Sequence, residues 1–208
     1  SQGTITAFAA LTQPYIAKMV EAPALLTPIS FLEHVSARLV LRMVSMHLDQ
    51  IVVSMGIHQL NFRSDVLISL VDDMCDGHVD CSDLLTSITG FLSLSLSLSL
   101  CVLIRKGTFS QYDYGMLKNL KLYGQPKPPV FDLNSIPKLL PLWMGYGGND
   151  ALADVKDVQH TLKELQSEPQ LLYVDNYGHI DFLMSIKAKE DVYEDMVGFF
   201  RSLGKSNS

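Results

Sequence analysis

The chain has 208 residues, of which 48% are hydrophobic and 18% are charged, as in a soluble globular protein of one large domain or two small ones. Its formal net charge is −6, and its basic residues form no run longer than Arg105-Lys106. This pattern argues against binding to nucleic acid or to an anionic membrane surface.

The three cysteines, Cys75, Cys81 and Cys101, have neither the spacing of a metal site nor the density of a disulfide framework. Cys75 and Cys81 could form a short disulfide loop in a secreted protein, and two free thiols are an equally good interpretation. The sequence contains no signal-peptide pattern and no Asn-x-Ser/Thr glycosylation acceptor. The residues alone therefore do not indicate a compartment.

Two elements are predicted near the start of the chain. Residues 3–20 carry apolar side chains at helical spacing, which predicts a helix with a break or kink at Pro14. The run ALLTPI at 24–29 is short and apolar and is closed by Pro28, which favours a buried strand over a helix.

The stretch 31–104 is unusual in composition. Residues 31–60 are rich in Met and other apolar residues, which we interpret as buried helix faces rather than a ligand-binding surface. Residues 61–90 hold a group of aspartates without the spacing of a calcium loop, so we expect a solvated acidic turn. Residues 91–104 alternate Leu with Ser, which suits a strand with one apolar face and is shorter than the about 20 residues that a membrane-spanning helix needs. We predict no transmembrane segment, and we expect this tract to be poorly packed.

Strands and helices alternate more clearly after Gly107. Glycines and prolines at 107–129 predict an ordered connection without regular structure. The patterns that follow predict a strand at 141–146, a helix at 154–167, a strand at 170–175, a loop at 176–180 and a helix at 189–203. On the last helix, the residues expected to face inward are Val192, Met196, Val197, Phe199, Phe200 and Leu203. This alternation predicts an α/β fold in which helices cover the faces of a parallel sheet.

Asp150 and His179 each follow one of the two late strands. One strand–helix–strand unit separates them, so both are expected at the same edge of the sheet, where α/β proteins place their reactive groups. A buried carboxylate that accepts the Nδ1 proton of an imidazole fixes its tautomer and stabilises the imidazolium formed in catalysis. Such a pair requires a nucleophile.

Ser1 is the candidate nucleophile. Ser1, Gln2 and Gly3, followed at once by a predicted helix, match the second half of the G-x-S-x-G nucleophile elbow, in which a serine occupies a tight strand-to-helix turn. The order Ser1, Asp150, His179 is the order of the triad in the α/β-hydrolase fold. Three residues are a weak motif, so the assignment depends on the rest of the sequence.

Four longer motifs make the pattern specific. They are GTFSQYDYG (107–115), YGQPKPPVFDL (123–133), LPLWMGYGGNDALADVKDV (140–158) and YGHIDF (177–182). With these motifs, residues 1–90 and 107–203 resemble the acid lipases of the gastric and lysosomal type, and look most similar to their plant relatives, the plant triacylglycerol lipases.

The resemblance implies the C-terminal part of an α/β-hydrolase fold with a mostly helical cap insertion. Residues 1–30 and 107–208 would form the hydrolase core, and residues 31–106 the cap or lid. The resemblance also implies hydrolysis of neutral lipid esters, triacylglycerol or sterol ester, at a lipid–water interface. Ser1, His179 and Asp150 would form the triad of an acyl-enzyme mechanism that uses neither a cofactor nor a metal. It suggests the secretory pathway, with an extracellular, lysosomal or vacuolar location.

Two features depart from the family pattern. Ser-Leu repeats replace a longer stretch of ordinary composition, and the early strands with one oxyanion element do not precede Ser1. The backbone N–H of Gln2 is one expected oxyanion donor, and its partner is not in the sequence. We therefore expect little or no esterase activity from the chain alone. The alternatives are a non-catalytic remnant or mis-spliced product of a lipase gene, and a lipid-interface binding module.

Neighbouring polar residues are given structural roles. Asp154 is the expected N-cap of the helix after Asp150, which leaves Asp150 for another role. Asp181 is expected to support the loop that carries His179, and it is the second-choice acid of the triad. The other histidines, which we interpret as structural or solvent-facing, are His34, His47, His58, His78 and His160.

Overall fold

The structure is a computed structural model that describes residues 2–37, 41, 45 and 107–205. Ser1, the three cysteines and the Ser-Leu tract lie outside the described residues, as does most of the segment 31–106 that is expected to form the cap. The predictions for those parts of the chain therefore stay predictions.

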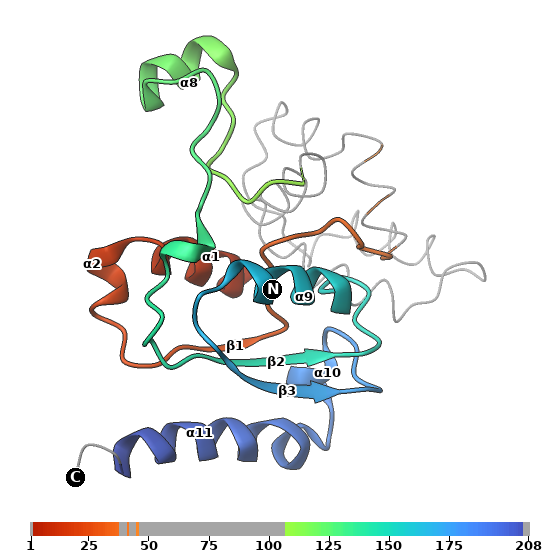
Figure 1. The fold of residues 1–208 in the computed structure, drawn as a ribbon. Helices are drawn as coiled ribbons and strands as arrows, with labels where there is room; N and C mark the ends of the chain where they lie inside the picture. The colour runs from red at the N-terminus through yellow and green to blue at the C-terminus, as the bar shows by residue number, and fades with distance from the viewer. Residues whose placement is uncertain (1, 38–40, 42–44, 46–106, 206–208) are drawn as a thin grey trace, which may run out of the picture.

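A parallel sheet of three strands forms the centre of the described fold (Figure 1). The strands are β1 (Ala24–Leu26), β2 (Trp143–Gly147) and β3 (Gln170–Val174), in the order β1-β2-β3. Leu25 is aligned with Met144, which is aligned with Leu171 on the other side. The predicted α/β class with a parallel sheet is confirmed.

Helices cover both faces of the sheet (Figure 1). One face carries α1 (Gln2–Leu11) and α9 (Val155–Glu164), and the other carries α11 (Glu194–Lys205). The predicted break at Pro14 is confirmed, because α1 ends at Leu11 and a short helix α2 (Pro14–Ala17) begins at the proline. Gln13, just before it, has the extended conformation that a following proline favours.

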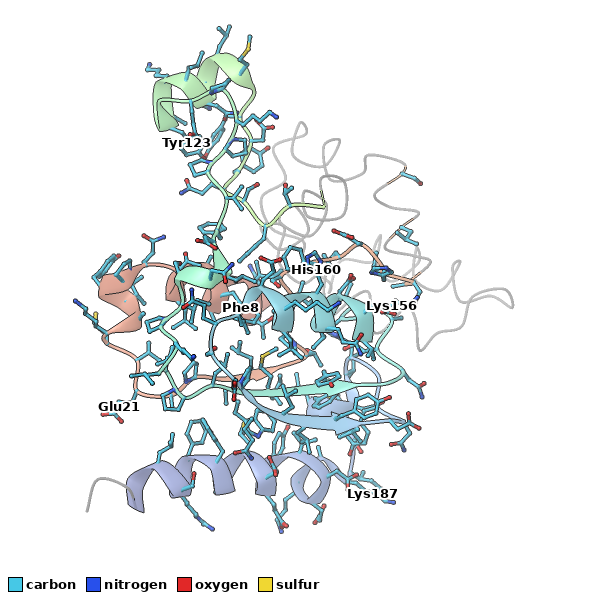
Figure 2. The ribbon with its side chains drawn as sticks, viewed as in Figure 1. Phe8, Glu21, Tyr123, Lys156, His160 and Lys187 are labelled. Atoms are coloured by element: carbon cyan, nitrogen blue, oxygen red, sulfur yellow. The ribbon has the colours of Figure 1, made fainter. Side chains whose placement is uncertain are left out.

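Successive residues of β2 point into two separate cores, as the pleat of a strand requires. Met144 belongs to the core between the sheet and the helices α1 and α9, where Phe8 is fully buried (Figure 2). Trp143 belongs to the opposite core, and the residues that surround it are Tyr177, Phe182, Val192 and Phe199. The indole N–H of Trp143 donates to Asp195 Oδ1 at 2.7 Å, which fastens α11 to the sheet.

The strand predicted at 24–29 is shorter than expected. Thr27 has a left-handed backbone with φ of 48°, and this ends β1 at Leu26. The backbone N–H of Thr27 still donates to the carbonyl oxygen of Gly145 at 2.8 Å.

The connection predicted at 107–129 contains a helix, α8 (Met116–Tyr123), which projects away from the sheet (Figures 1 and 2). Gly115 and Gly124, which suggested a loop, stand at its two ends, and Gly124 has the left-handed conformation of a helix C-cap. Leu117 is 80% exposed and Leu120 46% exposed, so these leucines of α8 are not buried in a core.

The C-terminal part of the chain contains further short helices. They are η1 (Leu133–Ser135), α10 (Asp181–Met184) and η2 (Lys189–Tyr193), of which η2 is a single turn of π-helix that continues into α11. The inward stripe of the predicted 189–203 helix is narrower than expected: Val197 is 39% and Phe200 42% exposed, whereas Val192 and Phe199 are buried. The helix touches the sheet through every third or fourth residue only, which leaves Val197 and Phe200 at the edge of the contact.

Candidate active site

Asp150 and His179 lie next to each other at the carboxyl ends of two adjacent strands. Asp150 follows the turn after β2, and His179 follows the loop after β3. Since the two strands are parallel and paired, both residues reach the same edge of the sheet.

The two side chains are hydrogen-bonded in a buried environment. His179 Nδ1 is 2.9 Å from Asp150 Oδ2 and 3.1 Å from Oδ1. His179 is 7% exposed and Asp150 4% exposed. Because a carboxylate only accepts hydrogen bonds, Nδ1 carries the proton and Nε2 remains as the basic nitrogen. This arrangement can take up a proton at Nε2.

The carboxylate of Asp150 is itself held by the backbone. Its Oδ1 accepts hydrogen bonds from the N–H groups of Leu152 at 2.9 Å and Ala153 at 2.7 Å. These donors fix the orientation of the carboxylate. Asp154, and not Asp150, caps α9 by accepting from the N–H of Lys156 at 2.8 Å, so the predicted cap is confirmed.

The turn after β2 and the loop before His179 are in direct contact. The N–H of Gly148 donates to the carbonyl oxygen of Val174, and the N–H of Asn149 donates to that of Tyr177, both at 3.0 Å. A Cβ atom at Gly147 would collide with the carbonyl oxygen of Tyr177. The approach of the two segments therefore requires glycine at 147.

Asp181 supports the His179 loop, as predicted. Its Oδ2 accepts the backbone N–H of Gly178 at 2.7 Å, and Asp181 begins the short helix α10. The residue is half-buried and points its carboxylate to the backbone. The carboxylate that contacts the imidazole Nδ1 of His179 is that of Asp150, not that of Asp181.

The remaining predicted site residues are at the start of the chain. Ser1 lies outside the described residues. Gln2 is the first residue of α1, which places its backbone N–H at a helix N-terminus, where N–H groups stabilise negative charge.

A second His–Asp pair lies elsewhere, between the segment after β1 and α9. His34 Nδ1 is 2.7 Å from Asp157 Oδ1, and the N–H of His34 donates to Oδ2 at 2.9 Å. Asp157 is buried, whereas 44% of the His34 side chain is exposed. On the same helix the ring of His160 stacks on Phe31, with centroids 3.9 Å apart. Both histidines thus have the structural or solvent-facing positions expected of them.

Within residues 2–37, 41, 45 and 107–205, no group of three or more His, Cys, Asp or Glu residues could hold a metal ion. Over the same residues, no helix is long and apolar enough to span a membrane.

Comparison with known proteins identifies relatives along the whole chain. Triacylglycerol lipase 1 of Arabidopsis thaliana is 59% identical, with 100% of this chain and 58% of the relative covered. Triacylglycerol lipase 2 of the same plant is 30% identical over 97% of the chain and 54% of its own length. Human gastric triacylglycerol lipase is 28% identical over 95% of the chain and 55% of its own length.

The chain thus spans little more than half the length of the curated relatives it matches. No family model matches the sequence. The parallel sheet and its flanking helices agree with part of an α/β-hydrolase fold, and the chain belongs to the same acid lipase family as these triacylglycerol lipases.

Proposed function

We propose that the chain carries the triad of a carboxylic ester hydrolase that acts on neutral lipids, with Ser1 as nucleophile, His179 as general base and Asp150 as the residue that orients His179. The main support is the buried hydrogen bond of 2.9 Å between His179 Nδ1 and Asp150 Oδ2. The relatives named triacylglycerol lipases support the substrate class.

The reaction would proceed through an acyl-enzyme. His179 Nε2 takes the proton of the Ser1 hydroxyl as its oxygen attacks the ester carbonyl carbon, and Asp150 stabilises the imidazolium that results. The imidazolium then gives this proton to the leaving alcohol as the ester C–O bond breaks. Water, activated by His179, hydrolyses the acyl-enzyme and releases the fatty acid. The Gln2 N–H is proposed as one donor to the oxyanion.

We propose triacylglycerol or sterol ester as substrate, taken up from a lipid–water interface. We also propose that residues 31–106 are an insertion in a core made by residues 1–30 and 107–208. The direct pairing of β1 with β2 supports this division, because the chain leaves the sheet after β1 and returns to it at β2.

A covalent serine probe tests the proposed function. The 208-residue chain is incubated with a fluorophosphonate, which needs only one turnover, and the labelled peptide is identified by mass spectrometry. We expect the label on Ser1 and none there in Ser1→Ala. Labelling should slow by about 10³-fold or more in His179→Ala, because the serine then lacks its base.

His34→Ala is the matched control, since it removes the histidine of the other His–Asp pair and should leave the labelling rate unchanged. Hydrolysis of a p-nitrophenyl ester by the same variants measures turnover, of which we expect little or none from the chain alone. If a folded chain is not labelled at Ser1, or is labelled equally in His179→Ala, the proposal is wrong and the non-catalytic alternative is favoured.

A further inference from the structure

The loop that carries His179 is also anchored by a tyrosine two residues before the histidine. Tyr177 is buried, and its hydroxyl oxygen is 2.9 Å from Asp191 Oδ2 and 3.1 Å from Ser185 Oγ. A hydroxyl has one proton and a carboxylate can only accept, so Tyr177 donates to Asp191 and accepts from Ser185. The Tyr177 side chain thereby ties the His179 loop to η2, the π-helical turn that holds Asp191.

The backbone of the same residue contacts the Asp150 segment. The carbonyl oxygen of Tyr177 accepts the N–H of Asn149, which directly precedes Asp150. Tyr177 therefore joins three parts of the chain: the end of β2, the loop of His179 and η2. A shift of its backbone would move His179 relative to Asp150.

A second contact from η2 reinforces the first. The hydroxyl of Tyr193 donates to the carbonyl oxygen of Phe182 at 2.7 Å. Phe182 is fully buried and packs edge-on against the ring of Tyr177, with centroids 5.3 Å apart. Asp191 and Tyr193 thus hold the segments before and after His179 from one turn of π-helix, an element often found at functional sites.

We propose that Tyr177, held by Asp191, is a positioning residue for His179: it fixes the loop so that the Nδ1–H of the imidazole stays on Asp150 and Nε2 stays free for proton transfer. Its effect on catalysis rests on the proposed function, whereas its effect on the state of the imidazole does not.

Nitrogen NMR of the histidine rings tests the proposal without any substrate. The full chain is labelled with ¹⁵N-histidine, and the His179 signals are assigned by their loss in His179→Gln. In the wild type near neutral pH we expect Nδ1 with the shift of a protonated nitrogen and Nε2 with that of an unprotonated one. In Tyr177→Phe and in Asp191→Ala the two shifts should move toward each other as the imidazole samples both tautomers.

The double variant separates positioning from general loosening. Because both substitutions remove the same hydrogen bond, their effects on the His179 shifts should not add in Tyr177→Phe/Asp191→Ala. Asp191→Asn keeps an acceptor oxygen and should restore the wild-type shifts in part. Asp191 is exposed, so its variants should fold even where Tyr177→Phe does not.

Tyr173→Phe is the matched control. Its hydroxyl also donates to a carboxylate, Asp175, at 2.9 Å, but this bond lies on the exposed side of β3. We expect it to leave the His179 shifts unchanged. The rate at which the fluorophosphonate labels Ser1 should fall about tenfold in Tyr177→Phe and stay unchanged in Tyr173→Phe. The expected fall is smaller than the about 10²-fold loss caused by a misplacement of 1 Å, because the imidazole still samples the correct position.

The outcomes for the two proposals are distinct. Unchanged His179 shifts in folded Tyr177→Phe and Asp191→Ala overturn the positioning role, whatever happens at Ser1. Altered shifts together with an unlabelled Ser1 in the wild type support the positioning of the imidazole and overturn the proposed function. A change of equal size in Tyr173→Phe would also overturn the positioning role.

Discussion

The backbone N–H of Asn149 donates to the carbonyl oxygen of Tyr177 at 3.0 Å, which joins the residue before Asp150 to the loop of His179. The side-chain hydrogen bond between Asp150 and His179 therefore forms between two segments that are already held together by their backbones. Preorganisation of this kind lowers the cost of orienting a catalytic pair.

Replacement of Asp150 by Asn should destabilise the protein less than replacement by Ala. Asp150→Asn keeps an oxygen that can accept from Leu152 and Ala153, whereas Asp150→Ala leaves those buried donors without an acceptor. We expect Asp150→Ala to lower the free energy of unfolding by about 1–3 kcal/mol for each buried donor left unpaired, and Asp150→Asn to cost less. Urea denaturation measures both.

Both variants should slow the reaction of Ser1 with the fluorophosphonate. Under the proposed function, Asp150→Asn should slow fluorophosphonate labelling of Ser1 by about 10³–10⁴-fold, because an amide can donate to Nδ1 and favour the wrong tautomer. A folded Asp150→Asn that labels at the wild-type rate would exclude Asp150 as the triad acid.

Gly147→Ala should strongly destabilise the protein. The added Cβ would overlap the carbonyl oxygen of Tyr177, which cannot move without breaking its hydrogen bond with Asn149. We expect a loss of about 1–3 kcal/mol or more in the free energy of unfolding. Gly198→Ala, in α11, is the control: nothing lies within 4 Å of its Cβ, and it should gain up to about 1 kcal/mol. Equal denaturation midpoints for the two variants would contradict the close approach.

Asp195→Ala should loosen α11 from the sheet. Trp143 is fully buried, and its indole N–H loses its acceptor in this variant. We expect a loss of about 1–3 kcal/mol in the free energy of unfolding. Trp143 is the single tryptophan of the chain, so its emission should shift to longer wavelength if water reaches the indole. Glu194→Ala changes the neighbouring exposed carboxylate and should leave the emission unchanged; a shift of equal size there would contradict the assigned role of Asp195.

Alkaline pH should cancel the stabilising effect of the Tyr177 hydroxyl. The hydrogen bond with Ser185 lowers the pKa of Tyr177. Burial and Asp191 together raise it by more, so the pKa lies above its ordinary value of 10.0. A raised pKa means that the folded state favours the neutral hydroxyl, whose contribution is complete below the unfolded pKa and is lost as the pH rises through the folded pKa.

The melting temperatures of the wild type and of Tyr177→Phe should therefore differ at pH 8 and converge well above pH 10. A difference that is present at pH 8 and stays constant over this range would show that the Tyr177 hydroxyl keeps its proton. No difference at pH 8 would show that the hydroxyl contributes nothing to stability.

The sequence predicted the relation between Asp150 and His179 because parallel strands bring their carboxyl ends to one edge, and a motif follows each end. It did not predict α8: Met116, Leu120 and Tyr123 recur at helical spacing, but the glycines and prolines around them were interpreted as a connection without regular structure. It also missed the pairing of His34 with Asp157, because nothing local in either segment indicates a partner so far along the chain.

Tyr177 illustrates the same limit at the candidate site. Its place in the motif YGHIDF is visible in the sequence. Its contact with Asp191 depends on the turn of π-helix at Lys189–Tyr193, where the residue pattern predicted an ordinary amphipathic helix. Hydrogen bonds across loops depend on backbone conformations that hydrophobic periodicity does not report.

The pairing of β1 with β2 has a consequence for how the protein can vary. Residues 27–142 separate the two strands along the chain, yet the register of Leu25 with Met144 is set by the pleat and by the cores on either face. The entropy of closing such a long connection grows only with the logarithm of its length, about 0.6 kcal/mol for each doubling. Evolution could therefore lengthen, shorten or rewrite the intervening segment while the edge that holds Asp150 and His179 kept its geometry.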